Sequence, residues 1–421
     1  MRGTPAQLAI HRVWKAEAAR VIGGLARLVK DVALAEDLAQ EALLAALEEW
    51  PRSGAPQNPG AWLTTTARNR ALNALKRARM AERAGEAIGP ELRPQRSLGE
   101  LEAALVANVD DDLGDDVLRL LFVACHPLLS QETRVTLTLR LVGGLSTEEI
   151  ARAFLTSEPT VAQRIVRAKR SLGEAAVPFE VPRGPELGPR LSSVLEVVYL
   201  IFNEGYAATA GEDLLRPALT EEALRLGGLL VALAPTEPEA HALLALMRLH
   251  ASRTSTRIDA GGEPVLLEAQ NRARWDRGQI AAGLQALEEA ERLAARPGPY
   301  QLQATIAACH ARAATAAETD WSRIVALYGE LLRIIPSPVV ELNRAVAVSR
   351  AEGPRAGLQL LDALASHPAL ARYHLLHAAR ADLLERLGDR EEARREYARA
   401  ATLTENARQR ERLKARAAAL E

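Results

Sequence analysis

Basic and amide side chains gather in two short stretches of this sequence, in a pattern suited to holding phosphates and reading bases. Six of the residues from Trp62 to Arg83 are Lys or Arg, against the single acid Glu82. Four of the residues from Pro159 to Leu172 are Lys or Arg, and no acid interrupts them. Cations contact phosphate oxygens, while amides and guanidinium groups also read base edges. The chemistry indicated is binding to nucleic acid.

The sequence contains no nucleophile motif, phosphate-binding loop or metal-ligand spacing, so we expect a protein that is not an enzyme and holds no cofactor or metal. Its two cysteines, Cys125 and Cys309, lie far apart and each precedes a histidine. A split zinc site could use such pairs, but a free cysteine is ordinarily a small buried side chain. We therefore expect structural thiols.

The elements that must position these side chains are helices. Of the 421 residues, 48% are hydrophobic and 25% charged, which suits two or three domains with ordinary cores. Ala, Leu and Arg dominate and strand-like runs are nearly absent, so the predicted fold class is all-α. Met1–Ile10 lacks the pattern of a signal peptide, and no apolar run reaches the roughly 20 residues that span a bilayer. We expect a cytoplasmic protein without a membrane partner.

The predicted domain boundaries follow charge and proline. The formal net charge is only −1, yet acids gather without a base from Glu100 to Asp116, and three prolines interrupt Val177–Pro185. Proline removes an amide donor and clashes with the preceding helical turn. We expect a helical bundle at 6–84, an acidic linker at 85–116, a second helical unit at 117–176, a Pro-rich connector at 177–185 and a helical array at 186–421.

The array carries weak internal repetition, at intervals of about 33 to 43 residues, which is typical of helical hairpins. Its clearest repeat has Gly388, Ala393 and Tyr397 at positions resembling the tetratricopeptide pattern. There we expect the small residues to let two helices cross closely and the tyrosine to fill the space above them.

An amphipathic helix is predicted over Val32–Trp50. One side carries Val32, Ala35, Leu38, Ala42, Ala46 and Trp50 at helical spacing, which predicts a buried face. The other side carries Asp37 and Glu41, with Gln40 adjoining. By itself an acidic stripe more often marks a solvated face than a binding surface, and only its context favours binding.

A second helix, Ala61–Arg79, follows a loop rich in Gly and Pro. Its candidate nucleic-acid contacts are Trp62, Arg68, Asn69, Arg70, Asn73, Lys76 and Arg77. Trp62 at the helix start could stack on an unpaired base, or it could pack in the core, and the sequence leaves both interpretations open.

A helix-turn-helix is predicted later in the chain. Ser146 and Glu149 have the spacing of a capping box, and Pro159 is tolerated in the first turn of the second helix. On that second helix, the side that should face the domain core carries Val161, Ile165, Ala168 and Leu172. The candidate DNA contacts on it are Thr160, Gln163, Arg164, Arg167, Lys169 and Arg170, a polar and basic face suited to a major groove.

These segments in this order resemble the ECF sigma factors of the sigma-70 family. The resemblance rests on Asp37–Ala42, Pro59–Leu63 and Ala67–Ala71 for conserved region 2, and on the helix-turn-helix for region 4. It implies that Asp37, Gln40 and Glu41 bind core RNA polymerase. The candidates on the second helix would then capture the melted −10 element of promoter DNA, and those on the helix-turn-helix would read the −35 element.

The array also resembles a known extension. Leu200–Tyr206, Asn271–Asp276 and Gly298–Ala304 are similar to the ECF group that carries a C-terminal tetratricopeptide-like domain. Polar residues lie in otherwise apolar helices of the array, at Asn203/Glu204, Arg274–Asp276, Gln301/Gln303, Asp320/Trp321 and Asn343/Arg344. They are expected to form structural hydrogen bonds, or alternatively to line a groove for a regulatory ligand or protein.

The leading hypothesis is a promoter-specificity subunit that binds core RNA polymerase, with the C-terminal array regulating it in cis. The alternative is a ligand-sensing helix-turn-helix regulator that acts without core polymerase. A third hypothesis is a scaffold that acts through the array alone.

Overall fold

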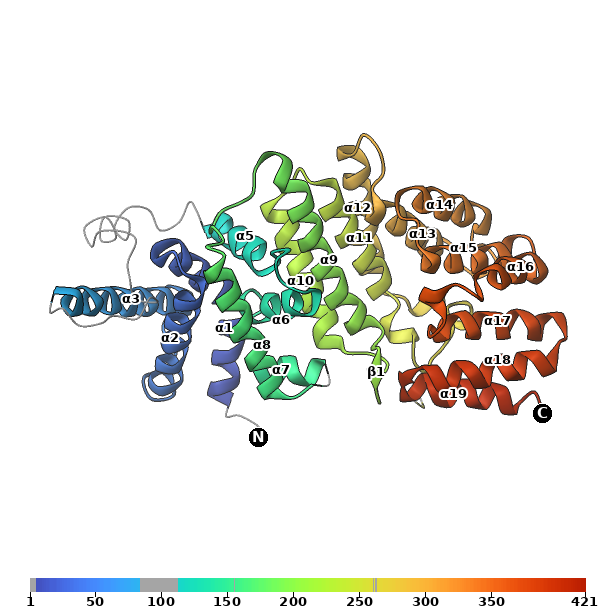
Figure 1. Ribbon diagram of the computed structural model, residues 1–421, viewed down its shortest axis with the longest axis horizontal. Helices are drawn as coiled ribbons and strands as arrows, with labels where there is room; N and C mark the ends of the chain where they lie inside the picture. Colours follow the sequence, from blue (N-terminus) through green and yellow to red (C-terminus); the bar gives the residue numbers. More distant parts are fainter. Residues whose placement is uncertain (1–4, 84–112, 155, 260, 262) are drawn as a thin grey trace. The chain divides into compact units, whose positions relative to one another are not determined.

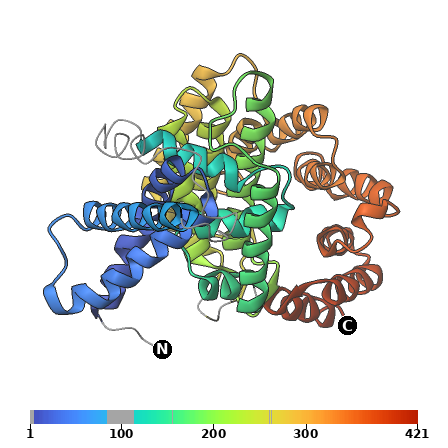
Figure 2. The ribbon, with the colours of Figure 1, turned by 60° about the vertical axis from the view of Figure 1, so that its left-hand side comes forward.

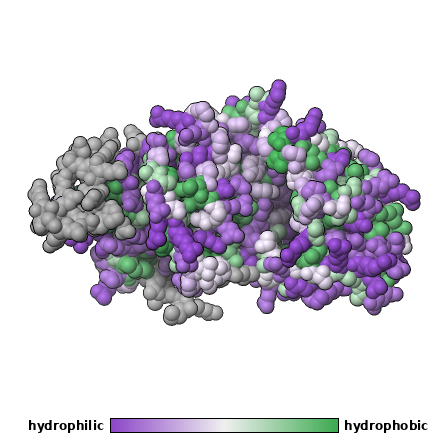
Figure 3. Space-filling model, in the orientation of Figure 1, coloured by the Kyte–Doolittle hydropathy of each residue, from purple (hydrophilic) through white to green (hydrophobic). Residues whose placement is uncertain are grey.

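The computed structural model describes residues 5–83, 113–154, 156–259, 261 and 263–421 (Figure 1). Helices dominate this part of the chain and the strands are only two residues long, which confirms the all-α class. Two compact units divide it, Met1–Val198 and Tyr199–Glu421. None of the described helices has the length and apolar character needed to cross a membrane. On the face shown in Figure 3, hydrophilic residues predominate and hydrophobic ones form small patches.

Within the described ranges, the first unit is built from eight α-helices, the last of which it shares with the second unit, and one 3-10 helix. Their bounds are α1 (Pro5–Val29), α2 (Val32–Ser53), α3 (Pro59–Arg83), α5 (Leu113–Ala124), α6 (Gln131–Leu141), α7 (Thr147–Ala153), α8 (Glu158–Glu174), η2 (Gly184–Glu186) and α9 (Leu187–Tyr206). Helices α1, α2 and α3 pack against one another, and α1 also packs against α5 and α6. Helix α9 continues past the end of this unit.

Local sequence explains where α2 begins and ends. The Asp31 side chain caps it by accepting from the amides of Ala33 at 2.7 Å and Leu34 at 3.0 Å. It ends at Gly54, whose φ of +83° suits glycine and whose amide bonds the Trp50 carbonyl. Five of the six residues predicted to face inward are buried, and Val32 at the helix start is half-buried. The predicted amphipathic helix is thus confirmed.

The acidic segment predicted as a linker falls mostly outside the described residues, at 84–112. Its last acid, Asp116, lies inside α5 and is 0% exposed, so the assignment of this residue to a linker is wrong. Its carboxylate is held by Arg27 at 3.0 Å and Arg119 at 2.6 Å. A buried carboxylate is stable when cations and hydrogen bonds replace its water.

The second unit contains the remaining described helices and the two short strands. Its successive α-helices pack against one another along the chain. Their bounds are β1 (Ala210–Gly211), α10 (Pro217–Leu233), α11 (Pro238–Ala251), η3 (Thr254–Thr256), η4 (Leu267–Ala269), η5 (Arg272–Arg274), α12 (Arg277–Leu293), α13 (Pro299–Arg312), α14 (Trp321–Ile334), α15 (Pro338–Ala351), α16 (Pro354–Leu364), η6 (Pro368–Leu370), α17 (His374–Leu387), α18 (Arg390–Leu403), β2 (Glu405–Asn406) and α19 (Ala407–Ala418). The helices from α13 onward follow an arc, best seen in Figure 2.

The two ends of this second unit meet. Strands β1 and β2 pair in parallel, with Ala210 opposite Glu405 and Gly211 opposite Asn406. The fully buried Asn406 amide donates to the carbonyls of Ala208 at 3.3 Å and Asp213 at 2.9 Å. The array is therefore closed on itself rather than open-ended.

Two glycines in the array have different roles. At Gly357 a Cβ atom would lie 2.8 Å from the Ala345 carbonyl oxygen, so glycine allows α15 and α16 to approach closely. Of the two small residues expected to allow a close crossing, Gly388 or Ala393, Gly388 does not do so, because a Cβ there would meet open space. Gly388 instead ends α17 in the left-handed conformation, at φ +89°. Ala393 and Tyr397 are buried as expected.

Candidate nucleic-acid interface

Helix α3 displays the residues predicted to contact the −10 element. Asn58 caps its start by accepting from the Ala61 amide at 3.0 Å. Of the seven candidates, Asn69, Asn73, Lys76 and Arg77 are exposed, while Trp62, Arg68 and Arg70 are half-buried. Leu63, Ala67, Ala71 and Ala74 form the packed side of the helix. The candidates therefore lie where a nucleic acid could reach them.

Trp62 combines the two interpretations that the sequence left open. Its ring meets Trp50 edge to face, with centroids 5.3 Å apart, so one edge is fixed against α2. The residue is only partly buried, so some of its surface remains exposed. A tryptophan held in this way presents a rigid face without further ordering.

The acidic side chains of α2 are also accessible. Asp37 is 70% exposed and Glu41 53% exposed, while Gln40 is half-buried. Glu41 accepts from Arg70 of α3 at 2.8 Å. An exposed ion pair of this kind is weak, so it can exchange for a charged partner.

Helices α7 and α8 form the predicted helix-turn-helix. The capping box is complete, with the Glu149 amide donating to Ser146 Oγ at 3.1 Å and the Ser146 amide to Glu149 Oε2 at 2.9 Å. Ser157 caps α8, which starts one residue before Pro159 and continues to Glu174. Val161, Ile165, Ala168 and Leu172 are buried, as their spacing predicted. This geometry is typical of DNA-binding helix pairs.

The candidates on α8 differ in their availability. Thr160, Gln163, Arg167 and Arg170 are exposed. Arg164 is half-buried and donates to Glu132 of α6 at 2.9 Å. Lys169 is half-buried and lies 3.2 Å from Asp37, with Glu36 as a second carboxylate partner. The structure thus brings one predicted DNA contact against one predicted polymerase contact.

Glu36 is a residue that the sequence analysis missed. It is 2% exposed, and Arg140 of α6 donates to it at 2.6 Å. The Arg140 side chain also bonds the Leu145 carbonyl at 3.2 Å. Glu36 lies four residues after Val32, within the apolar stripe of α2, and that position was the available signal. It joins α2 to α6 and α8 at one buried point.

A second link between these parts is Lys15 of α1, which donates to Glu149 at 2.7 Å. Partial burial raises the pKa of Glu149, but the Lys15 ammonium and the Ser146 amide outweigh it and leave the pKa below its usual range. The carboxylate is therefore charged at neutral pH. It serves both the capping box and the contact with α1.

Comparison with known families and proteins decides the family. Sigma-70 region 2 matches residues 13–80, and sigma-70 region 4 matches residues 119–172. The ECF RNA polymerase sigma factor SigL of Mycobacterium tuberculosis is 32% identical over 169 residues, which are 40% of this chain and 89% of SigL. The chain belongs to the ECF sigma-factor family. It is a sigma factor, and the alternative of a regulator acting without core polymerase is not favoured.

The remainder of the sigma factor matches other sequences. Residues 190–291 match a family of unknown function, DUF6596. An uncharacterised protein of Rhizobium meliloti is 43% identical over 392 residues, which are 92% of this chain and 90% of that protein. That relative therefore shares both the sigma domains and the helical array. The tetratricopeptide-like character expected of the array is consistent with the DUF6596 match.

Proposed function

We propose that α2, α3 and α8 divide the work of promoter recognition among three surfaces. Asp37, Gln40 and Glu41 on α2 bind core RNA polymerase. The seven candidates on α3 hold the melted −10 element, with Trp62 as a stacking platform. The six candidates on α8 contact the −35 element in the major groove. The observation that carries the proposal is the simultaneous exposure of Asp37, Asn69 and Gln163.

Run-off transcription with purified core polymerase tests this proposal. The full chain should direct defined start sites on genomic fragments. A set of variants separates the surfaces, because a change on α2 should reduce binding to core polymerase, whereas a change on α3 or α8 should leave core binding intact and reduce promoter binding. Failure to obtain any defined start site would contradict the proposal.

We further infer that the ion pairs around Glu36 hold the sigma domains in a closed state that must open. The pairing of Lys169 with Asp37 competes with the contacts of Lys169 to DNA and of Asp37 to the polymerase, although Asp37 remains 70% exposed. A partner that binds only the open state shifts the population toward it, and the closed state lowers the apparent affinity of that partner.

We also propose that the second unit regulates the sigma domains in cis. The first half of α9 supports this, because it packs on the helix-turn-helix unit: Ser193 donates to the Cys125 carbonyl at 2.6 Å, and Arg190 to the Phe122 carbonyl at 2.7 Å. Since α9 then enters the second unit, one continuous helix connects the two.

The test compares the full chain with a chain ending at residue 198. A chain ending after Ala176 would also lose the first half of α9, so any effect could reflect loss of that packing alone. Transcription by the 1–198 chain should differ from that of the full chain. Identical transcription would contradict regulation in cis and would leave the sigma function unaffected.

A further inference from the structure

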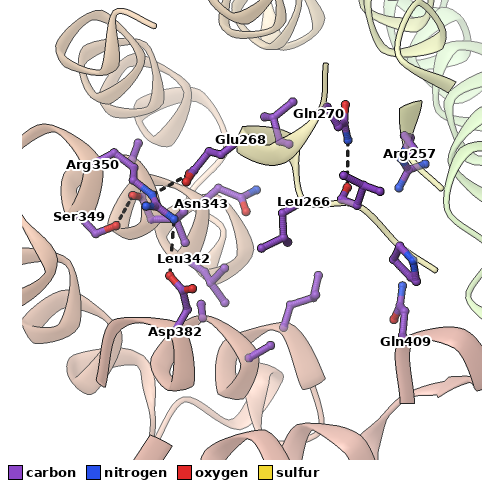
Figure 4. A pocket seen from close by; sticks show the side chains of 18 of the residues that line it. Arg257, Leu266, Glu268, Gln270, Leu342, Asn343, Ser349, Arg350, Asp382 and Gln409 are labelled. Carbon is purple, nitrogen blue, oxygen red and sulfur yellow. Dashed lines mark hydrogen bonds and ion pairs between the residues drawn. The ribbon is translucent and has the colours of Figure 1, made fainter. Parts of the chain in front are cut away.

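A cavity of about 570 Å³ lies within the second unit, inside the arc of helices (Figure 4). Its wall is completed by Tyr206 at the end of α9, by residues of 253–257 and 264–270, and by α19, which directly follows β2. Ligand sites for small molecules have this size. No part of the sigma machinery described above lines it.

One wall of the cavity carries two arginines without an acidic partner. Arg253 directly precedes η3 and bonds the His250 imidazole at 2.6 Å. Arg257 lies 3.7 Å from the centroid of the Tyr206 ring and donates to the Tyr206 carbonyl. Among the described residues, no carboxylate lies within salt-bridge distance of either guanidinium. Cation–π contact and carbonyls position these groups but do not neutralise them.

The surroundings add to the positive charge. Arg253 and Arg272 both lie over the Trp275 ring, at 5.9 and 5.1 Å. The Arg272 guanidinium bonds the His310 and Ala313 carbonyls at 2.9 and 3.0 Å, again without a carboxylate. Burial lowers the pKa of Arg257 and of Arg272, and the charge of Arg253 lowers both further. Positive charge is concentrated here, and Glu318 and Glu268, whose charges act on Arg272 from a distance, form no ion pair with it.

The opposite wall is different. There Arg350 lies 2.8 Å from Glu268 and 3.5 Å from Asp382, so its charge is balanced. In Figure 4 this cluster and Arg257 lie on opposite sides, with Leu266 between them. Leu266 is 47% exposed, and Leu342 also faces the space, so part of the cavity is apolar.

We propose that this cavity binds a small organic anion, with its carboxylate or phosphate group on Arg253 and Arg257 and its apolar body against Leu266. An anion there supplies the missing countercharge, and guanidinium groups bind both kinds of oxyanion in a bidentate manner. Any regulatory meaning of the site rests on the proposed regulation in cis, whereas binding itself does not.

The first experiment titrates the full-length protein with benzoate, with phenyl phosphate and with the neutral benzamide, using calorimetry and thermal melting. At least one anion should bind saturably and raise Tm, and benzamide should bind at least tenfold more weakly. Binding of benzoate alone assigns a carboxylate ligand, and binding of phenyl phosphate alone assigns a phosphate. Absence of binding by both anions up to about 10 mM, or equal binding of benzamide, overturns the proposal.

The second experiment uses variants of the same protein. Arg257→Gln and Arg253→Gln should weaken anion binding at least tenfold, while Arg274→Gln, which changes an exposed arginine of η5 outside the cavity, should not. Leu266→Glu places a carboxylate in the cavity and should abolish anion binding without lowering Tm. Unchanged binding by Arg257→Gln or by Leu266→Glu overturns the proposal, and the second variant decides should the first fail to fold. Because neither readout involves transcription, failure here leaves the sigma function untouched.

Discussion

The Lys169 ammonium on α8 lies 3.2 Å from the Asp37 carboxylate on α2. Lys169 belongs to the face predicted to read DNA and Asp37 to the face predicted to bind polymerase. Beside them the buried Glu36 carboxylate is shared by Lys169 and Arg140. These ion pairs thus stabilise the closed state proposed above. Breaking them would free the polymerase-binding face of α2 and the DNA-reading face of α8.

Replacing Arg140 tests this relationship without touching any predicted contact with polymerase or DNA. Arg140→Met leaves Glu36 buried with Lys169 as its remaining cation and should lower stability by about 1–3 kcal/mol. Because the closed state is weakened, affinity for core polymerase should rise. Thermal melting and a core-binding titration measure the two effects.

The matched control is the double variant Arg140→Met with Glu36→Leu, in which apolar side chains replace the buried pair. Such replacements are often neutral or stabilising, so Tm should recover. A fall in core affinity for Arg140→Met would argue against a closed state that opens on binding.

The acidic surface of α2 should be required for binding to core polymerase. Asp37→Arg combined with Glu41→Arg reverses two exposed charges and should lower core affinity at least tenfold in a pull-down or titration. Glu49→Arg, an exposed acid at the end of the same helix, controls for net charge. Unchanged affinity of the double variant would remove α2 from the interface.

The arginines of α8 should differ in importance. Arg167 is exposed with no ion-pair partner among the described residues, whereas Arg164 already pairs with Glu132 at 2.9 Å. Arg167→Ala should therefore weaken promoter binding by the holoenzyme by about 1 kcal/mol and reduce the salt slope by about one. Arg164→Ala should have a smaller effect. Equal losses in filter binding across a salt series would contradict this ranking.

His310 gives the second unit a pH dependence of known sign. Burial, with the charges of Arg253 and Arg272, lowers its pKa to about 3, and the neighbouring His250 is likewise held neutral by burial. The unfolded chain takes up this proton near pH 6.5, whereas the folded chain does not until about pH 3. Stability is therefore full above pH 6.5 and is lost as pH falls below it.

The measurement is Tm against pH for the natural protein and His310→Phe, which keeps an aromatic ring against Trp321. The advantage of the variant should grow from pH 7 to pH 4, and a difference that is constant with pH would show that His310 does not carry the effect. Anion binding at Arg253 should raise the His310 pKa, which the imidazole resonances would report.

Periodic elements were predictable from the sequence. The buried stripe of α8 and the Ser146 capping box follow from spacing alone, because a helix fixes which residues share a face. The burial of Glu36 and Asp116 was not predicted, because an acid is expected to be solvated when only the sequence is known. The fold places a cation beside each of them, Arg140 beside Glu36 and Arg27 beside Asp116.

The cavity was beyond sequence reasoning for a similar cause. Arg253 and Arg257 lie in a short irregular segment without periodicity. They stand out only because no carboxylate among the described residues lies within salt-bridge distance of them. Of the polar clusters noted in the sequence, Asp276 and Asp320 proved to be helix caps, whereas Trp321 and Asn343 line the cavity. Composition alone does not distinguish these outcomes.

Closure of the array should depend on Asn406, whose amide joins two carbonyls about 200 residues earlier in the chain. Its Oδ1 also caps α19 by accepting from the Gln409 amide at 3.2 Å. Asn406→Ala leaves the buried Ala208 carbonyl and the partly buried Asp213 carbonyl without their donor and removes a cap, which should lower stability by about 2–3 kcal/mol. Because α19 completes the cavity wall, binding of the probe anions should weaken as well.

The control is Asn271→Ala, which removes an exposed cap of η5 and should lower stability by less than about 1 kcal/mol in the same melting experiment. Equal effects of the two variants would mean that the ends of the array do not hold each other.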